Sequence, residues 1–211
     1  MKHMLLSISL GLTLYSCSPP SDKLPVYGNK IALDQSKGTS NVMDSVDYTI
    51  PDFNFWNQDS VPVNARLVDG KIWVVDFFFT ACPSICPKMK KEMLRIYEKY
   101  EADSNLVILS FSIDPKRDSV ARLHAYAAKL GINNSSKWHL LTGDKDSIYS
   151  IAEKFLVSAE EDPDAPGGHV HSGNFILVDK QRRLRGYYDG VKTESVDQLL
   201  LDIDVLKKEE N

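Results

Sequence analysis

The sequence has no long hydrophobic run, no excess of positive charge and few cysteines. No apolar stretch approaches the ~18–20 residues that a membrane-spanning helix needs, which excludes a polytopic membrane protein. The 25 Lys and Arg residues are outnumbered by 29 Asp and Glu residues, and this mild acidity argues against nucleic-acid binding. Hydrophobic residues still make up 43% of the chain, which excludes disorder throughout.

Cysteine is scarce, with three residues in a chain of 211. The length allows one domain of fair size or two small ones. A domain of ~150 residues or more buries enough surface to fold without a disulfide framework. The three cysteines therefore need another explanation.

The first of them, Cys17, lies at the end of a predicted secretion signal. Lys2 and His3 precede an apolar run over residues 4–14, and a small residue, Ser16, stands before Cys17. This pattern is typical of a bacterial signal peptide, and residues 14–17 are similar to a lipobox, where lipoproteins are acylated on cysteine and cut. We expect a lipid on Cys17; the alternative is a plain signal peptide that leaves Cys17 as a free thiol.

This prediction divides the chain into three parts. Residues 1–16 are the expected lipoprotein signal peptide, residues 17–46 a proline-containing lipidated tether, and residues 47–211 the folded domain. The tether could dock near residues 24–27. Lipidation would place the protein in the bacterial cell envelope, facing the periplasm, where paired thiols serve as disulfides, redox centres or metal ligands.

Within the domain, strand-like and helix-like patterns alternate. Short apolar runs predict buried strands, and apolar residues at helical spacing predict amphipathic helices. We expect strands at residues 73–79, 106–113 and 138–141, helices at 88–100, 118–130, 146–155 and 196–206, and a hairpin at 174–178 and 184–188. Asp118 is the expected N-cap of the second helix.

This order predicts an α/β fold with a largely parallel central sheet and a late antiparallel hairpin. A mixed sheet with helices on both faces and a terminal hairpin and helix fits a thioredoxin-like arrangement. Ligands of open sheets bind beyond the carboxyl ends of the strands. The carboxyl end of the first central strand is Phe79-Thr80-Ala81-Cys82.

The pair Cys82 and Cys86 lies where this strand passes into a helix. Thiols four residues apart share one face of a helical turn, and a helix N-terminus lowers a thiol pKa toward neutrality. Two thiolates alone are a poor zinc site, because structural zinc takes four ligands. Together with one or two other donors they suit copper, particularly Cu(I). The alternatives are a structural disulfide or two passive side chains.

A third donor could come from histidine. His124 and His139 lie in a predicted helix and strand, where a surface or packed position is expected. His169 and His171 follow two glycines in a predicted loop before residues 174–178, and this loop could face the end of the first strand. Imidazole suits copper, but the spacing alone does not choose between His169 and His171.

Five blocks of sequence carry a resemblance to a known family. The chain resembles the Sco/SenC family of copper-binding, thioredoxin-like proteins that serve cytochrome c oxidase assembly, over about residues 50–206. The similar blocks are residues 50–53 with 57–59 (an opening N-terminal hairpin), 76–87 (the metal-binding motif), 112–118, 141–143, and 171–172 followed by 175–179.

The resemblance implies copper ligands at Cys82, Cys86 and His171, and leaves His169 solvated or a spare ligand. It implies a role for Asp114 and Asp118 in partner contact or in tuning the copper; the alternatives are a turn at Asp114 and the helix cap at Asp118.

The resemblance predicts a copper metallochaperone that supplies the dinuclear copper site of cytochrome c oxidase subunit II from an unknown donor. A thiol–disulfide oxidoreductase using the same cysteines is the second hypothesis, and a peroxidase that attacks through Cys82 is the third. Nothing in the pattern requires more than a monomer.

Overall fold

The computed structural model describes residues 23–28, 31–32 and 45–209. The predicted signal peptide and Cys17 lie outside the described residues. The described chain begins with a two-strand pair, β1 (Ile31–Ala32) and β2 (Ser45–Val46), and continues into a hairpin, β3 (Asn54–Trp56) and β4 (Pro62–Asn64). The predicted N-terminal hairpin is therefore present. Residues 50–53 precede β3, and residues 57–59 lie in the turn between β3 and β4. The strands of the hairpin therefore lie a few residues later in the chain than predicted.

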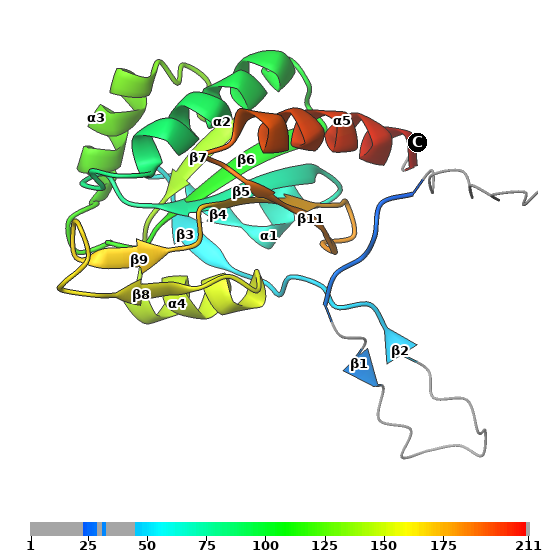
Figure 1. Ribbon diagram of the computed structural model, residues 1–211, viewed down its shortest axis with the longest axis horizontal. Coiled ribbons are helices and arrows are strands. Elements are labelled where there is room, and N and C mark those ends of the chain that lie inside the picture. The colour runs from blue at the N-terminus through cyan, green and yellow to red at the C-terminus, as the bar shows by residue number, and fades with distance from the viewer. Residues whose placement is uncertain (1–22, 29–30, 33–44, 210–211) are drawn as a thin grey trace, which may run out of the picture.

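A five-stranded mixed sheet forms the centre of the molecule (Figure 1). Its strands follow the order β11-β10-β5-β6-β7, with the bounds β5 (Ile72–Phe78), β6 (Leu106–Ser112), β7 (Trp138–Leu141), β10 (Asn174–Val178) and β11 (Leu184–Asp189). β5, β6 and β7 are parallel, while β10 is antiparallel to both β5 and β11. The thioredoxin-like mixed sheet with its late hairpin is confirmed.

Helices cover both faces of this sheet (Figure 1). On one side lie α2 (Cys86–Tyr100), α3 (Val120–Leu130) and α5 (Thr193–Glu209), and on the other α1 (Ala65–Val68), α4 (Lys145–Lys154) and the β3–β4 hairpin. Strand β5 is buried along its whole length and sends alternate side chains into the two cores. Val74 and Phe78 pack against the first group of helices, whereas Trp73 and Phe77 pack against the second.

A small hairpin lies outside the central sheet, next to α4. Its strands are β8 (Ala159–Glu161) and β9 (His169–His171), and His171 pairs with Ala159. The prediction of a loop at His169 and His171 was wrong here. Both residues belong to a strand whose partner is an acidic segment with little strand propensity of its own.

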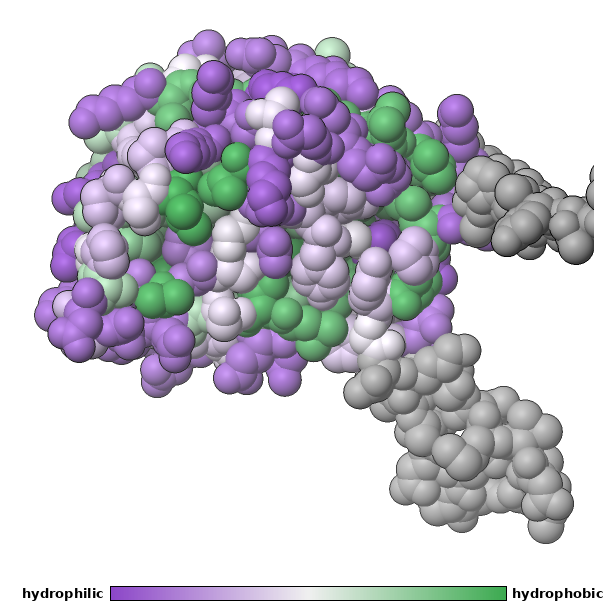
Figure 2. Space-filling view, in the orientation of Figure 1, coloured by the Kyte–Doolittle hydropathy of each residue, from purple (hydrophilic) through white to green (hydrophobic). Residues whose placement is uncertain are grey.

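The surface is mixed in character. On the face shown in Figure 2, hydrophilic side chains surround small groups of apolar ones. Large apolar side chains that are exposed occur at scattered positions, which include Trp56, Val61, Leu156, Val170 and Leu201. Isolated exposed residues of this kind are normal for folded proteins. Among the described residues, no helix combines the length and apolarity that a membrane span requires.

Candidate metal centre

The two domain cysteines lie at the carboxyl end of β5, as the sequence predicts. The Cys82 amide donates to the carbonyl of Phe79 in a turn, and Cys86 is the first residue of α2. Pro87 stands in the first turn of α2, where a missing backbone N–H costs little. Both thiols are free. Cys86 is 1% exposed and Cys82 is partly exposed, so only one of the two sulfurs faces the opening of the site.

His171 completes a group of three donors. Cys82, Cys86 and His171 each place one ligand atom within 4.8 Å of the others. The Nε2 atom of His171 lies 3.3 Å from the Sγ atom of Cys86. In the part of the chain that the structure describes, this is the one group of three or more Cys, His, Asp or Glu side chains that could hold a metal ion.

The orientation of the His171 ring follows from its other nitrogen. Nδ1 lies 2.8 Å from the carbonyl oxygen of Ser172, and because a carbonyl can only accept, Nδ1 carries the proton and donates. Nε2 is therefore the nitrogen that faces the sulfurs, where it donates to a thiolate when it carries a proton and can bind a metal when it does not. A backbone contact that fixes the tautomer in this way is a common feature of metal-binding histidines.

The two thiols differ in acidity. Burial raises the pKa of Cys82, but hydrogen bonds from His171 and Cys86 outweigh it and lower the pKa to about 5. Deeper burial, together with the neighbouring Cys82, raises the pKa of Cys86 to about 12. Without a metal, the pair holds one thiolate and one thiol at neutral pH, and the thiolate is on the more exposed residue.

A narrow pocket of about 150 Å³ leads to these donors. Its lining combines Phe79, Cys82 and His171 with Ile85, Pro166 and His169. The Phe79 ring contacts both imidazoles, with centroid distances of 5.2 Å to His169 and 6.0 Å to His171. The surroundings of the sulfurs are therefore mainly apolar, which protects a soft thiolate site from water.

Asp118 is fully buried and holds the loop that carries Cys82. It accepts hydrogen bonds from the amide and hydroxyl of Thr80 and from the hydroxyl of Ser112. Direct contact with a partner is wrong for Asp118, because its side chain has no exposed surface. The predicted helix cap is also wrong: Ser119 is the N-cap of α3, and its side chain accepts from the amide of Arg122.

Asp114 is 5% exposed, which likewise leaves little surface for partner contact. Its Oδ2 atom lies 3.3 Å from Nε of Arg117 and 3.5 Å from Nε2 of His169. The His169 side chain is only 7% exposed, so the prediction of a solvated histidine was wrong. Nor does His169 join the three donors.

Two further residues near the site, Tyr149 and Arg122, had not been predicted. The hydroxyl of Tyr149 lies 3.4 Å from Nδ1 of His169, and Nε of Arg122 donates to the hydroxyl of Thr80. The sequence held no local signal for these contacts, because the partners are 20 and 42 residues apart. The other histidines lie as predicted: His139 is packed, and His124 is exposed.

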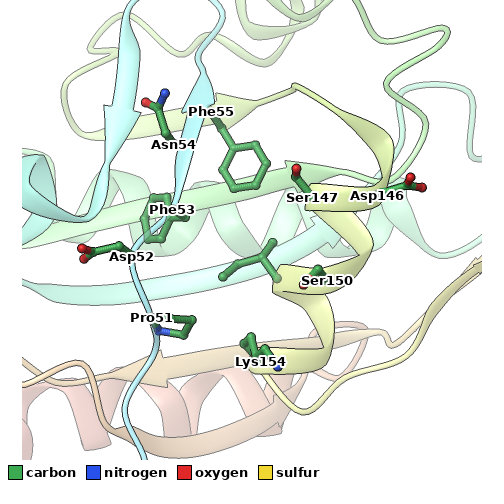
Figure 3. A pocket seen from close by; sticks show the side chains of 10 residues that line it. Pro51, Asp52, Phe53, Asn54, Phe55, Asp146, Ser147, Ser150 and Lys154 are labelled. Atoms are coloured by element: carbon green, nitrogen blue, oxygen red, sulfur yellow. The ribbon is translucent and has the colours of Figure 1, made fainter.

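A second hollow lies elsewhere on the molecule. A groove of about 550 Å³ separates residues 51–55 from α4, and Figure 3 shows Phe53, Phe55 and Ser150 along its walls. It holds no thiol and no histidine among its lining residues. The chemistry of the chain is concentrated at the thiols rather than in this groove.

Comparison with known proteins agrees with this geometry. A model of the SCO1/SenC family matches residues 42–206. The chain belongs to the SCO1/SenC family. It is 30% identical over 168 residues to the SCO1 protein homolog of Bacillus subtilis, an alignment that covers 79% of this chain and 86% of that protein.

Solved structures of other family members share the fold. A SCO1/SenC family lipoprotein from Bacillus anthracis superposes with a TM-score of 0.69 at 28% identity, covering 76% of this chain and 95% of that one. BsSco, described as a cytochrome c oxidase assembly protein with a disulfide switch, gives 0.65 at 30% identity, with coverages of 75% and 93%. Copper-bound ScoI of Arabidopsis thaliana gives 0.61 at 25%, with coverages of 73% and 97%.

Proposed function

We propose that this SCO1/SenC protein is a copper metallochaperone that binds one copper ion through Cys82, Cys86 and His171. The observation that carries the proposal is the meeting of two sulfurs and one imidazole nitrogen within 4.8 Å, from two separate parts of the chain. A copper-bound relative with the same fold supports the choice of metal.

The chemistry of the donors also favours copper. Soft thiolates with imidazole select Cu(I) among the common metals, whereas structural zinc takes four protein ligands. Cu(I) binding would release the proton that Cys86 holds, because a metal ligand must be the thiolate. The contact of Nδ1 with the Ser172 carbonyl leaves Nε2 of His171 as the nitrogen that would bind the metal.

The proposed acceptor is the dinuclear copper site of cytochrome c oxidase subunit II. BsSco is described as a member of a family of cytochrome c oxidase assembly proteins, which supports this direction of transfer. Transfer by ligand exchange needs one copper ligand that a ligand of the acceptor can reach and displace. Cys82 is that ligand, since it is the more exposed sulfur and lines the pocket. The protein that supplies copper to this chain is unknown.

The proposed location is the bacterial cell envelope, with a lipid on Cys17 and the domain of residues 47–211 facing the periplasm as a monomer. The motif at residues 14–17 and the B. anthracis relative, which is a lipoprotein, support this anchoring. The tether is residues 17–46, and residues 1–16 are the signal peptide that is removed.

The test is an anaerobic Cu(I) titration of the reduced protein against a competing chelator. Wild type is compared with Cys82→Ser, Cys86→Ser and His171→Ala, and with His124→Ala as the matched control, because His124 is exposed and distant from the thiols. We expect one copper per chain, lost in both cysteine variants, weakened in His171→Ala and unchanged in His124→Ala. Tight binding that survives the loss of either cysteine would refute the assignment.

A second function is favoured by the acidity of the thiols. A half-exposed thiolate beside a buried thiol is the arrangement of a thiol–disulfide oxidoreductase. Cys82 would attack a partner's disulfide, and Cys86 would then displace the partner, which leaves reduced as the pair is oxidised. The Cys82–Cys86 potential tests this: a reductant should lie near about −270 mV, the value of thioredoxin. A far less reducing potential would rule out the reductase function and leave copper transfer as the remaining proposal.

A further inference from the structure

Residues 24–27, which follow the proposed lipidation site, are held against the domain by a buried arginine. Arg185 on β11 is 3% exposed. Its Nη2 atom donates to the carbonyl of Leu24 at 2.7 Å, and its Nε atom donates to the carbonyl of Pro25 at 3.0 Å. The amide of Leu24 in turn donates to the carboxylate of Glu209, at the end of α5.

The arginine depends on this segment for its own stability. Its other contacts go to Asp179, which is fully buried, and to Glu209, at 3.0 and 2.6 Å. A buried charge is stable only when all of its polar groups have partners. Without Leu24 and Pro25, Nε of Arg185 would lose the carbonyl that accepts its hydrogen bond, and the segment is therefore part of the ionic site rather than a chance neighbour.

A second contact lies two residues further along. The amide of Tyr27 donates to the carbonyl of Leu184 at 2.8 Å, and these two residues form an isolated antiparallel bridge on the edge strand β11. The ring of Tyr27 meets the ring of Tyr187 edge to face, with centroids 5.4 Å apart. We call the contacts of residues 24–27 with Arg185, Glu209 and Leu184 the tether clamp.

The tether clamp and the metal centre lie at opposite ends of the sheet. Leu184 pairs with Val178, and Val178 pairs with Trp73, near the start of β5. The cysteines follow the other end of β5, which spans seven residues, or about 20 Å. Figure 1 shows the same relationship: the dark blue segment passes the end of α5, on the side of the molecule away from β9.

We propose that the tether clamp holds the domain on the membrane with the metal centre directed away from the lipid. The inference rests on the proposed lipid at Cys17. Only residues 18–23, six in number, then separate the anchor from the clamp, instead of the 29 residues from 18 to 46. Six residues can span at most about 20 Å and 29 residues at most about 100 Å, at 3.3–3.6 Å per residue.

The consequence concerns the partner. With the clamp closed, the end of the domain that carries Arg185 stays beside the bilayer, and the thiols face outward at a nearly fixed height. Such an arrangement suits an acceptor that carries its metal site in a folded domain, at a distance from the surface of the same membrane. It does not serve an acceptor whose metal site lies at the lipid surface.

The experiment measures which end of the domain is near the lipid. The acylated full chain is reconstituted in nanodiscs that contain a headgroup-labelled quenching lipid, and its acylation is checked by mass spectrometry. A fluorescent amino acid replaces either Ser104, an exposed residue at the clamp end, or Lys88, an exposed residue one turn beyond Ile85. We expect strong quenching at position 104 and weak quenching at position 88.

Two variants open the clamp in different ways. Arg185→Gln removes the charge, and Tyr27→Pro removes the N–H that bonds Leu184 without disturbing the core. Tyr27→Ala keeps that N–H and is the control for the second; Lys99→Ala, which removes an exposed ion pair with Asp204 at the clamp end of the fold, is the control for the first. We expect the difference in quenching between positions 104 and 88 to be lost in Arg185→Gln and Tyr27→Pro and kept in both controls.

Hydrogen exchange shows independently whether the clamp has opened: at the Tyr27 amide in Arg185→Gln, and at the Leu24 amide, which donates to Glu209, in Tyr27→Pro. Equal quenching of the two labels in the acylated wild type would overturn the inference. A label difference that persists when the Tyr27 amide exchanges freely would also overturn it. If mass spectrometry finds Cys17 without a lipid, the proposed anchoring is wrong and the inference falls with it, while copper binding by the thiols is unaffected.

Discussion

Nε2 of His169 lies 3.5 Å from Oδ2 of Asp114, and both side chains are almost fully buried. Among the described residues, this Oδ2 is a buried oxygen without a hydrogen bond, and the Arg117 guanidinium and the His169 imidazole are the polar groups beside it. His169 is two residues before His171 on the same short strand. The contact therefore ties the strand that carries the proposed copper ligand to the loop after β6.

His169→Ala should weaken both the fold and the metal site. Removing the imidazole takes away the contacts of His169 with Asp114 and with the Phe79 ring, and the loss of buried contacts of this kind costs about 0.5–3 kcal/mol. We expect a fall of this size in the free energy of unfolding and weaker Cu(I) binding, because β9 is less firmly placed. Denaturant unfolding and the chelator titration measure the two effects.

Two companion variants separate positioning from simple destabilisation. Val170→Ala changes the residue between the two histidines, which is 38% exposed, and should leave Cu(I) affinity unchanged. His169→Gln keeps a polar group toward Asp114 and should restore part of the affinity. Full Cu(I) affinity in His169→Ala would show that β9 holds His171 without this contact.

A buried ion pair lies behind the thiols and should be costly to break. Nζ of Lys90 on α2 lies 2.7 Å from Oδ2 of Asp76 on β5, both side chains are at most 2% exposed, and the ammonium stands 4.0 Å above the Phe78 ring. Lys90→Met leaves a buried carboxylate unpaired, and such losses cost about 3–5 kcal/mol. Thermal or denaturant unfolding of the reduced protein measures the loss.

The double variant Lys90→Met with Asp76→Leu is the control. Replacing both charges by apolar groups of similar size is often close to neutral. We therefore expect the double variant to be more stable than Lys90→Met alone. If it were equally unstable, the loss would come from packing rather than from the unpaired charge.

The sequence predicted the elements that bring the cysteines to their place, because the signals there are local. A continuous apolar run marks β5, and a C-x-x-x-C pair with two prolines marks the passage into α2. The choice between His169 and His171 came from the family resemblance, since spacing left it open. The structure supports that choice by placing His171, and not His169, beside the sulfurs.

What the sequence did not predict depends on contacts between distant residues. β8 begins Ala159-Glu160-Glu161, which carries no strand signal, and it forms because β9 pairs with it. The loop between them packs closely on Phe79: a Cβ on Gly167, whose φ is +90°, would lie 2.6 Å from that ring. Asp118 and Ser119 are both good N-caps by type, and Ser119 takes the role because Thr80 and Ser112 engage Asp118.

Alkylation of the reduced, metal-free protein should show the difference between the two thiols. Thiolate is the reactive form, and the pKa of Cys82 is lowered to about 5 while that of Cys86 is raised to about 12. Iodoacetamide should therefore modify Cys82 at a nearly constant rate from pH 8 to pH 6 and more slowly below pH 5. Cys86 should stay unmodified over this range, as peptide mass spectrometry can show.

The His171→Ala variant tests the cause of this acidity. A hydrogen bond from His171 is the largest of the contacts that lower the pKa of Cys82. Without it, the pH below which the alkylation of Cys82 slows should be higher than in wild type. An unchanged profile would mean that the helix terminus and Cys86 stabilise the thiolate without the imidazole.

His139 should make the fold sensitive to mild acid. The residue is 4% exposed, burial lowers its pKa from 6.5 to about 4, and Nδ2 of Asn57 lies 3.2 Å from its Nδ1. Between these two pH values the unfolded chain binds a proton that the folded chain does not, so stability falls as the pH drops from 6.5 to 4. At 1.36 kcal/mol per pKa unit the loss is about 3 kcal/mol. Denaturant unfolding at several pH values should show this slope in wild type and a shallower one in His139→Gln, which cannot bind a proton in this range; equal slopes would assign the acid sensitivity to other groups.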